Sequence, residues 1–279
     1  FKFKSTPLGR KPTDDDLVYV IRNGIPGTAM PAFQSLSVAE IESLVQYVKY
    51  LSIRGQLERR LLAEIDSLDG DPLLDLELAR SAAEGDPDRE QFAEQIQTIL
   101  EEYLIEDIVD RWAGADTAVS DVPVPPESFL SDHQQHGSLI ESGRQLFRGR
   151  ANSVQCHGLT GVGDGQNENY DDWTNDWLKT AGVDPNFPET YQPFLEAGAM
   201  PPPNISPRNL RLSVFRGGSR PADIYRRIAN GIEGTPMPSA PTLSSDEIWA
   251  LVAYVRNLRF ESADAVAGVG HLLPVAEAE

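Results

Sequence analysis

The chain has 279 residues, of which 40% are hydrophobic, so it is long enough for two domains with separate cores. Its formal charge of −19 and pI of about 4.6 argue against nucleic acid and anionic membranes as partners and favour a protein with basic patches. The same charge is also typical of a protein that is simply kept soluble. No stretch approaches the run of about 20 apolar residues that a transmembrane helix needs, so no transmembrane segment is expected.

A loop that presents a methionine lies between two expected helices near the start of the chain. The loop Gly27-Thr28-Ala29-Met30-Pro31 contains glycine and proline, which predicts irregular backbone. After it, Ser37 and Glu40 form a capping box, and apolar residues at 41, 44, 45 and 48 follow helical spacing. The pattern predicts a helix that runs to Leu51.

An acidic segment follows, with predicted helices at Gln56–Asp66 and Asp88–Trp112. The second has an apolar stripe, made of Phe92, Ile96, Ile99, Leu100, Tyr103 and Ile108. A spacer helix packed on a neighbouring domain is the favoured interpretation, and a partner-binding helix is the alternative. The proline-rich run Val122–Pro126 predicts an extended linker and a domain boundary.

The methionine loop and the helix after it occur twice, at a constant spacing. The loop Asn23–Pro31 corresponds to Asn230–Pro238, where the methionine is Met237. The following helix matches without a gap, since Leu36, Ser37, Glu40, Ile41, Leu44, Val45, Tyr47, Val48 and Leu51 correspond to Leu243, Ser244, Glu247, Ile248, Leu251, Val252, Tyr254, Val255 and Leu258. A repeat of this length indicates two related domains, each with a methionine on a loop.

The single cysteine, Cys156, stands directly before His157. A C-x-x-C-H run is the attachment signal of c-type haem, and here Ser153 occupies the position of the first cysteine. One thioether link at Cys156 and one axial bond from His157 still hold a haem. Met237 is the expected second axial ligand, because a thioether suits iron in electron-transfer sites. Met200 is a weaker candidate, since the repeat does not support it.

Three other chemistries fit the sequence less well. The glycines from 161 to 165 lack both the preceding strand and the spacing of a dinucleotide-binding loop. Cys156 and His157 are adjacent on an expected helix, so their side chains point apart, which disfavours a nucleophile–base pair. His133 and His136 are too few ligands for zinc.

The segment from about Gly137 to Arg259 resembles class I cytochrome c domains. Gly143 and Phe147 resemble the contact pair of the N-terminal helix. The other matching motifs are the attachment site Cys156-His157-Gly158, the glycine loop 161–165, the ligand loop 234–238 and the C-terminal helix 248–258. The resemblance implies an all-α fold with covalent haem c and a periplasmic or otherwise extracytoplasmic location.

The resemblance also implies a diheme cytochrome c in which the first domain lacks its attachment half. We expect residues 1–54 to be the C-terminal half of a first cytochrome c-like domain and 55–136 to be a helical acidic linker. Residues 137–262 are the expected cytochrome c domain, and 263–279 a tail. One haem c is expected here, and Met30 becomes an iron ligand only if a second is present through an attachment half from a longer chain or from elsewhere.

Single-electron transfer with His/Met ligation is therefore the favoured function, as a carrier or as a subunit of a membrane-associated redox complex. The alternative is a haem-depleted structural or docking subunit, which Ser153 favours. A peroxidase is the weakest reading, since an iron with a methionine ligand has no position open to peroxide.

Overall fold

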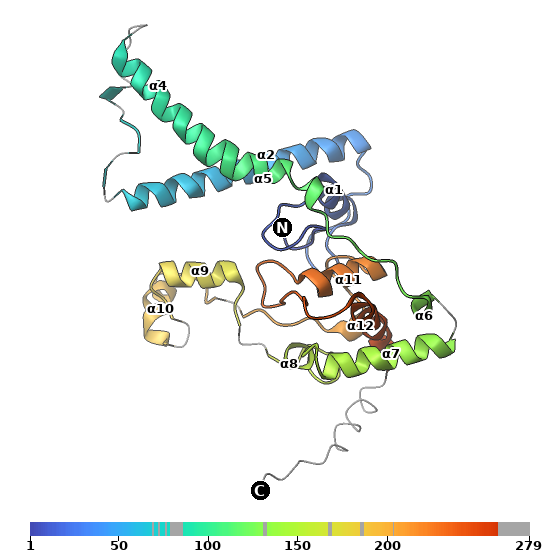
Figure 1. Ribbon diagram of the computed structural model, residues 1–279. Helices are drawn as coiled ribbons and strands as arrows, with labels where there is room; N and C mark the ends of the chain where they lie inside the picture. The colour runs from blue at the N-terminus through green and yellow to red at the C-terminus, as the bar shows by residue number, and fades with distance from the viewer. Residues whose placement is uncertain are drawn as a thin grey trace. The chain divides into compact units, whose positions relative to one another are not determined.

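The structure, a computed structural model, describes residues 1–68, 70–71, 73–75, 77–78, 86–130, 133–166, 169–184, 187–202 and 204–261. Across these residues the regular structure is entirely helical, with no strand (Figure 1). The predicted all-α class is confirmed. The expected tail, 263–279, lies outside the described residues.

The chain divides into two compact units. Unit 1 comprises residues 3–24 and 31–120 with Phe1, and unit 2 comprises Lys2, residues 25–30 and the chain from Asp121 onward. The helices of unit 1 are α1 (Asp14–Asn23), α2 (Val38–Ser67), α4 (Pro87–Ile99), η1 (Leu100–Val109), α5 (Asp110–Ala113) and η2 (Asp116–Ala118). Those of unit 2 are α6 (Glu127–Leu130), α7 (His133–Arg148), α8 (Val154–His157), α9 (Asp172–Thr180), α10 (Pro188–Glu196), η3 (Leu210–Leu212), α11 (Pro221–Asn230), α12 (Ser245–Asn257) and η4 (Leu258–Phe260).

The helices that follow the methionine loops begin at the predicted capping boxes. The hydroxyl of Ser37 accepts a hydrogen bond from the backbone N–H of Glu40, whose carboxylate accepts one from the N–H of Ser37 at 2.8 Å. Ser244 and Glu247 make the same pair of bonds at the start of α12. These caps satisfy backbone donors that have no partner inside the helix.

Helix α2 is longer than predicted. It continues from Val38 to Ser67 as one helix, so the expected helix to Leu51 and that at Gln56–Asp66 are joined. Gly55 lies in its interior, where a single glycine lowers helix propensity without ending the helix. The sequence-based boundary at residue 54 therefore falls inside a continuous helix.

The acidic segment contributes to the core of unit 1. Helices α4, η1 and α5 follow one another without interruption from Pro87 to Ala113, which confirms the predicted helix at Asp88–Trp112, and η1 is wound as a π-helix. Ile108 and Trp112 are 3% and 5% exposed. They cluster with four buried residues of α1 and α2, namely Leu17, Ile21, Ile41 and Val45. This packing favours the spacer interpretation over a free partner-binding helix.

Unit 2 is organised around α12, which is buried on almost all sides. Its residues from Ile248 to Val255 are all buried. Helix α7 packs against it, and the ring of Phe147 lies edge-on to the ring of Tyr254, with centroids 5.3 Å apart. The indole N–H of Trp249 donates to the carbonyl of Pro123 at 3.2 Å, so the proline linker is held against α12.

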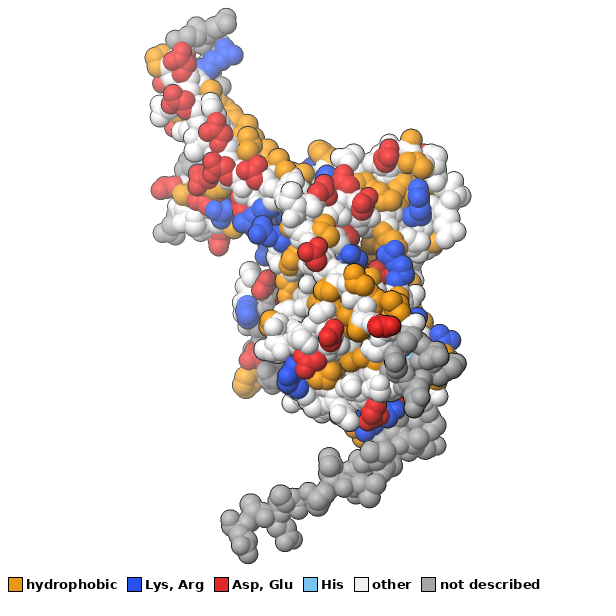
Figure 2. Space-filling view, turned by 45° about the vertical axis from the view of Figure 1, so that its right-hand side comes forward, with side chains coloured by type: hydrophobic (Ala, Val, Ile, Leu, Met, Phe, Trp, Pro, Cys, Tyr) orange, Lys and Arg blue, Asp and Glu red, His pale blue; other side chains and the backbone are white. Residues whose placement is uncertain are grey.

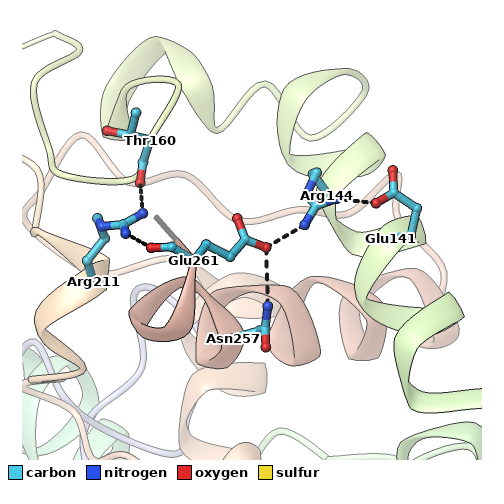
Figure 3. Close-up of polar contacts among 6 residues, drawn as sticks. All are labelled: Glu141, Arg144, Thr160, Arg211, Asn257 and Glu261. Carbon is cyan, nitrogen blue, oxygen red and sulfur yellow. Dashed lines mark hydrogen bonds and ion pairs between the residues drawn. The ribbon is translucent and has the colours of Figure 1, made fainter. Parts of the chain in front are cut away.

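A group of polar contacts ties the end of η4 to the rest of unit 2 (Figure 3). The carboxylate of Glu261 pairs with Arg144 of α7 at 2.5 Å and accepts a hydrogen bond from the amide of Asn257 at 3.2 Å. The guanidinium of Arg211, beside η3, donates to the carbonyls of Glu261 and Thr160. The hydrogen bond between Arg144 and Glu261 is the main cause of the raised pKa of Arg144. Four separate segments are thereby held together.

We predict that Gly143→Ala lowers the free energy of unfolding by about 1–3 kcal/mol, the usual cost of overpacking. A Cβ at Gly143 overlaps the carbonyl of Ala250 and lies 2.8 Å from the Cβ of Tyr254, so α7 and α12 have to separate. Urea denaturation measures the loss.

The matched control is Gly137→Ala on the same helix, where a Cβ meets nothing within 4 Å. Because alanine favours helix, this variant should be unchanged or more stable by up to about 1 kcal/mol. Equal midpoints for the two variants contradict the proposed close crossing.

Candidate functional site

Cys156 and His157 lie on the single turn of α8, and Ser153 is the N-cap residue directly before it, with helical backbone angles. The backbone N–H of His157 donates to the carbonyl of Ser153 at 2.8 Å, and that of Gly158 donates to Val154 at 2.9 Å. Residues three apart on a helix share a face, so Ser153 lies where a first cysteine would be paired with Cys156. Cys156 is a free thiol and is partly buried. The turn thus has the arrangement of a haem-attachment segment with one sulfur in place of two.

The ring of His157 is held by a backbone carbonyl. Its Nδ1 lies 3.1 Å from the carbonyl oxygen of Arg208. A carbonyl only accepts hydrogen bonds, so Nδ1 carries the proton and the lone pair of Nε2 is left for a metal. Burial lowers the pKa of His157, and the bond to Arg208 opposes this in part. The neutral imidazole that results is the form that binds iron.

The glycine loop after His157 folds back onto α8. The N–H of Gly163 donates to the carbonyl of His157 at 2.9 Å, and the N–H of Gln166 donates to that of Gln155 at 2.7 Å. Gly158 has a φ of +73°, a conformation that side chains disfavour. A Cβ there also overlaps the carboxylate of Asp164. The loop therefore needs glycine at 158 for two separate reasons.

Met237 lies on the loop that joins α11 and α12 and is partly buried. The loop is held by its own hydrogen bonds: the N–H of Ile232 donates to the carbonyl of Met237 at 3.1 Å, and the hydroxyl of Thr235 donates to Ile232 at 2.7 Å. The N–H of Met237 in turn donates to Thr235 Oγ1 at 3.3 Å. These bonds fix the backbone on either side of the methionine.

The loop of Met30 has the same bonds. The N–H of Ile25 donates to the carbonyl of Met30 at 3.2 Å, and the hydroxyl of Thr28 donates to Ile25 at 2.8 Å. The N–H of Met30 donates to Thr28 Oγ1 at 3.2 Å. Identical local geometry in the two loops explains why both copies keep the Gly-Thr-x-Met-Pro sequence.

The remaining candidates differ in position. Met200 follows α10 and is 89% exposed, so it is not held toward any part of the described structure. His136 is edge-on to Phe129 and lines a cavity of about 390 Å³ with residues of α12 and η4, away from α8. The side chain of His133 lies outside the described residues. Sequence reasoning missed Arg208, which acts through its carbonyl and so carries no side-chain signal.

The donor set fits a c-type haem. A thiol next to a histidine on one helical turn would supply a covalent anchor and a nitrogen ligand, and the free Nε2 of His157 follows from the hydrogen bond to Arg208. Met237 would add a thioether, on a loop whose backbone is held by its own hydrogen bonds. All-helical packing around such a turn defines a cytochrome c-like protein.

The comparisons with known proteins agree with this class. The family described as cytochrome c oxidase, cbb3-type, subunit III, matches residues 4–48 and 138–255, which is more than half of the chain and includes both methionine loops. The chain belongs to this family. Membership implies covalently bound haem c and, in general terms, a role in electron transfer. No curated protein matches the chain.

One solved structure is similar in fold, a chain of the reducing HAO-like protein complex of Kuenenia stuttgartiensis. The two are 23% identical with a TM-score of 0.52, and the match covers 92% of this chain and 77% of that one. At this identity the match supports the fold alone. Among the described helices, none is long and apolar enough to cross a membrane.

We predict that Gly158→Ala destabilises the chain more than Gly182→Ala does. Both glycines have positive φ, +73° and +67°, so both variants carry the backbone cost of about 1–2 kcal/mol. Only Gly158 faces a carboxylate, whereas a Cβ at Gly182 meets nothing within 4 Å. Urea denaturation of the two variants isolates the packing against Asp164, and equal losses contradict it.

Proposed function

We propose that the chain transfers single electrons through one haem c attached at Cys156, with His157 and Met237 as axial ligands. The observation that carries the proposal is the fixed orientation of His157, whose Nδ1 is bound to the Arg208 carbonyl beside a free thiol. A bound haem supplies a one-electron iron couple. The chain contributes the anchor, both ligands and a partly buried site, and methionine ligation raises the reduction potential.

A haem-depleted structural or docking subunit is the second candidate. Ser153 favours it, because one of the two usual thioether anchors is missing. The neutral, oriented imidazole of His157 favours the haem-bearing form, since a purely structural histidine has no need of a free Nε2.

We propose further that residues 1–54 are the later half of a first cytochrome c-like domain. Support comes from the Met30 loop, whose hydrogen bonds repeat those of the Met237 loop. Met30 would then be an axial ligand of a second haem when an attachment half is supplied. Within residues 137–262, the α8 turn and the Met237 loop belong to one complete domain.

The proposed partners are redox proteins with basic patches, outside the cytoplasm. Acidic side chains gather along the helical arm of α4 and η1 (Figure 2). The exposed members are Asp88, Glu90, Glu94, Glu101, Glu102 and Glu106. Such a surface attracts a cationic partner over about 8–10 Å at physiological salt. Salt-sensitive association rates would accompany this mode of encounter.

We predict that the purified protein carries one covalently attached haem, which Cys156→Ser abolishes. Ser153→Cys should add a second thioether, because the two side chains share a face of α8. Intact mass after denaturation detects the attached haem, and a pyridine haemochrome spectrum distinguishes one thioether from two. Wild-type protein without added mass contradicts the proposal and leaves the haem-depleted subunit.

We predict that Met237→Ala keeps the haem attached but lowers the reduction potential and lets carbon monoxide bind the ferrous protein. The reason is the loss of one axial thioether. Potentiometry and a ligand-binding titration measure the two effects. Met200→Ala is the matched control, because Met200 is 89% exposed. If only Met200→Ala opens the iron, Met237 is not the ligand.

A further inference from the structure

The internal repeat allows α2 and α12 to be compared residue by residue. One face is buried in both helices: Ile41 and Val45 are each 1% exposed, and their counterparts Ile248 and Val252 are 4% and 0% exposed. Each of these pairs packs within the core of its own unit. This face of α2 is therefore already covered by the core of unit 1.

A second face differs sharply between the copies. Leu44, Tyr47 and Leu51 of α2 are 38%, 56% and 46% exposed, whereas the identical residues Leu251, Tyr254 and Leu258 are 2%, 0% and 0% exposed. The same side chains are thus core in one unit and surface in the other. Exposing three large apolar side chains along one helix face is unfavourable in water and marks a surface that a partner covers.

The exposed face is hollowed. A shallow groove of about 570 Å³ runs along it, lined by Leu36, Ala39, Glu40, Ser43, Leu44 and Tyr47. Four of these six residues are identical to their counterparts in α12 or in the loop before it, and a fifth, Ser43, corresponds to the similarly small Ala250. Only Ala39, opposite Asp246, departs from this pattern.

Unit 2 shows what covers the equivalent face. Gly143 of α7 lies against the carbonyl of Ala250, the counterpart of Ser43, and Phe147 is edge-on to Tyr254 at 5.3 Å. Just after α7, the guanidinium of Arg150 pairs with Glu247, the counterpart of Glu40. The covering segment thus has a glycine, an aromatic ring four residues later and a cation three residues after that. The residues they contact correspond to Ser43, Tyr47 and Glu40 of the groove.

We propose that the groove on α2 binds a helix of the α7 type, supplied from outside residues 1–279. Its glycine packs at Ser43, its aromatic ring on Tyr47, and its basic side chain pairs with Glu40. The proposal rests on residues 1–54 being the later half of a cytochrome domain, and it names the element that completes this half. The groove has an apolar floor and one lining carboxylate, Glu40, which suit such a helix.

The test uses a second copy of residues 133–150, joined ahead of Phe1 of the full chain by a linker of about 15 Gly/Ser residues, which spans roughly 20 Å. Tethering raises the local concentration of a helix that is marginal alone. Hydrogen exchange of α2 amides from 41 to 51 should slow at least tenfold, because docking stabilises this stretch against local opening. No slowing overturns the proposal.

Matched variants locate the contact. Tyr47→Lys in the chain, or Phe147→Asp in the added copy, should abolish the slowing. Leu62→Lys should keep it, since Leu62 lies on α2 beyond the groove and is 67% exposed. Slowing that survives Tyr47→Lys overturns the proposal, because the added helix then binds elsewhere.

Two other occupants give different results, and either overturns the proposal. A second copy of the chain predicts a dimer in sedimentation that Tyr47→Lys dissociates. If residues 262–279 occupied the groove, hydrogen exchange of α2 would be faster in a chain that ends at Glu261 than in the full chain. Hydrogen exchange of α2 amides is measured independently of the haem, and the attached haem is detected by intact mass. Failure of the docking proposal therefore leaves the haem proposal intact, and the reverse also holds.

Discussion

The close crossing of α7 and α12 is the constraint on which unit 2 depends. Gly143 lets the two backbones meet, because any side chain there overlaps the Ala250 carbonyl. With the helices in contact, Phe147 reaches Tyr254, and α8, a few residues beyond the end of α7, is held beside the same core. Gly143 thus permits the helix crossing, and Val154 of α8 packs against the core that this crossing forms. The geometry of this turn therefore depends on helix packing as well as on its own hydrogen bonds.

The two methionine loops show how local hydrogen bonds can hold the backbone around a methionine in one conformation. In each loop a threonine hydroxyl donates to a carbonyl and accepts from the N–H of the methionine. These bonds join residues only two to five positions apart, so they form without the rest of a domain. This explains how the loop of Met30 keeps the geometry of the Met237 loop although the residues around the two loops differ.

Much of the helical framework could be predicted from local signals. The caps at Ser37 and Ser244 lie in the sequence itself, as does the helical spacing over Asp88–Trp112, and both the caps and this helix were confirmed. The length of α2 was missed, because an isolated Gly55 resembles a helix end without being one. The hydrogen bond between His157 and the carbonyl of Arg208 was missed, because a backbone carbonyl is the same in every residue type. Burial was least predictable: Tyr47 and Tyr254 have identical local patterns, and only the presence of a second helix separates their environments.

The contacts of Glu261 have a practical consequence for anyone who shortens or labels this protein. Its carboxylate contacts α7 and the end of α12, and its carbonyl accepts from Arg211 of η3, which also donates to the carbonyl of Thr160 (Figure 3). A stop codon a few codons before Glu261 would remove these contacts while keeping Cys156, His157 and Met237, the proposed haem-binding residues. Affinity tags or fluorophores are better attached beyond Glu261, where the reporter does not compete with Arg144 and Arg211 for the same oxygen atoms.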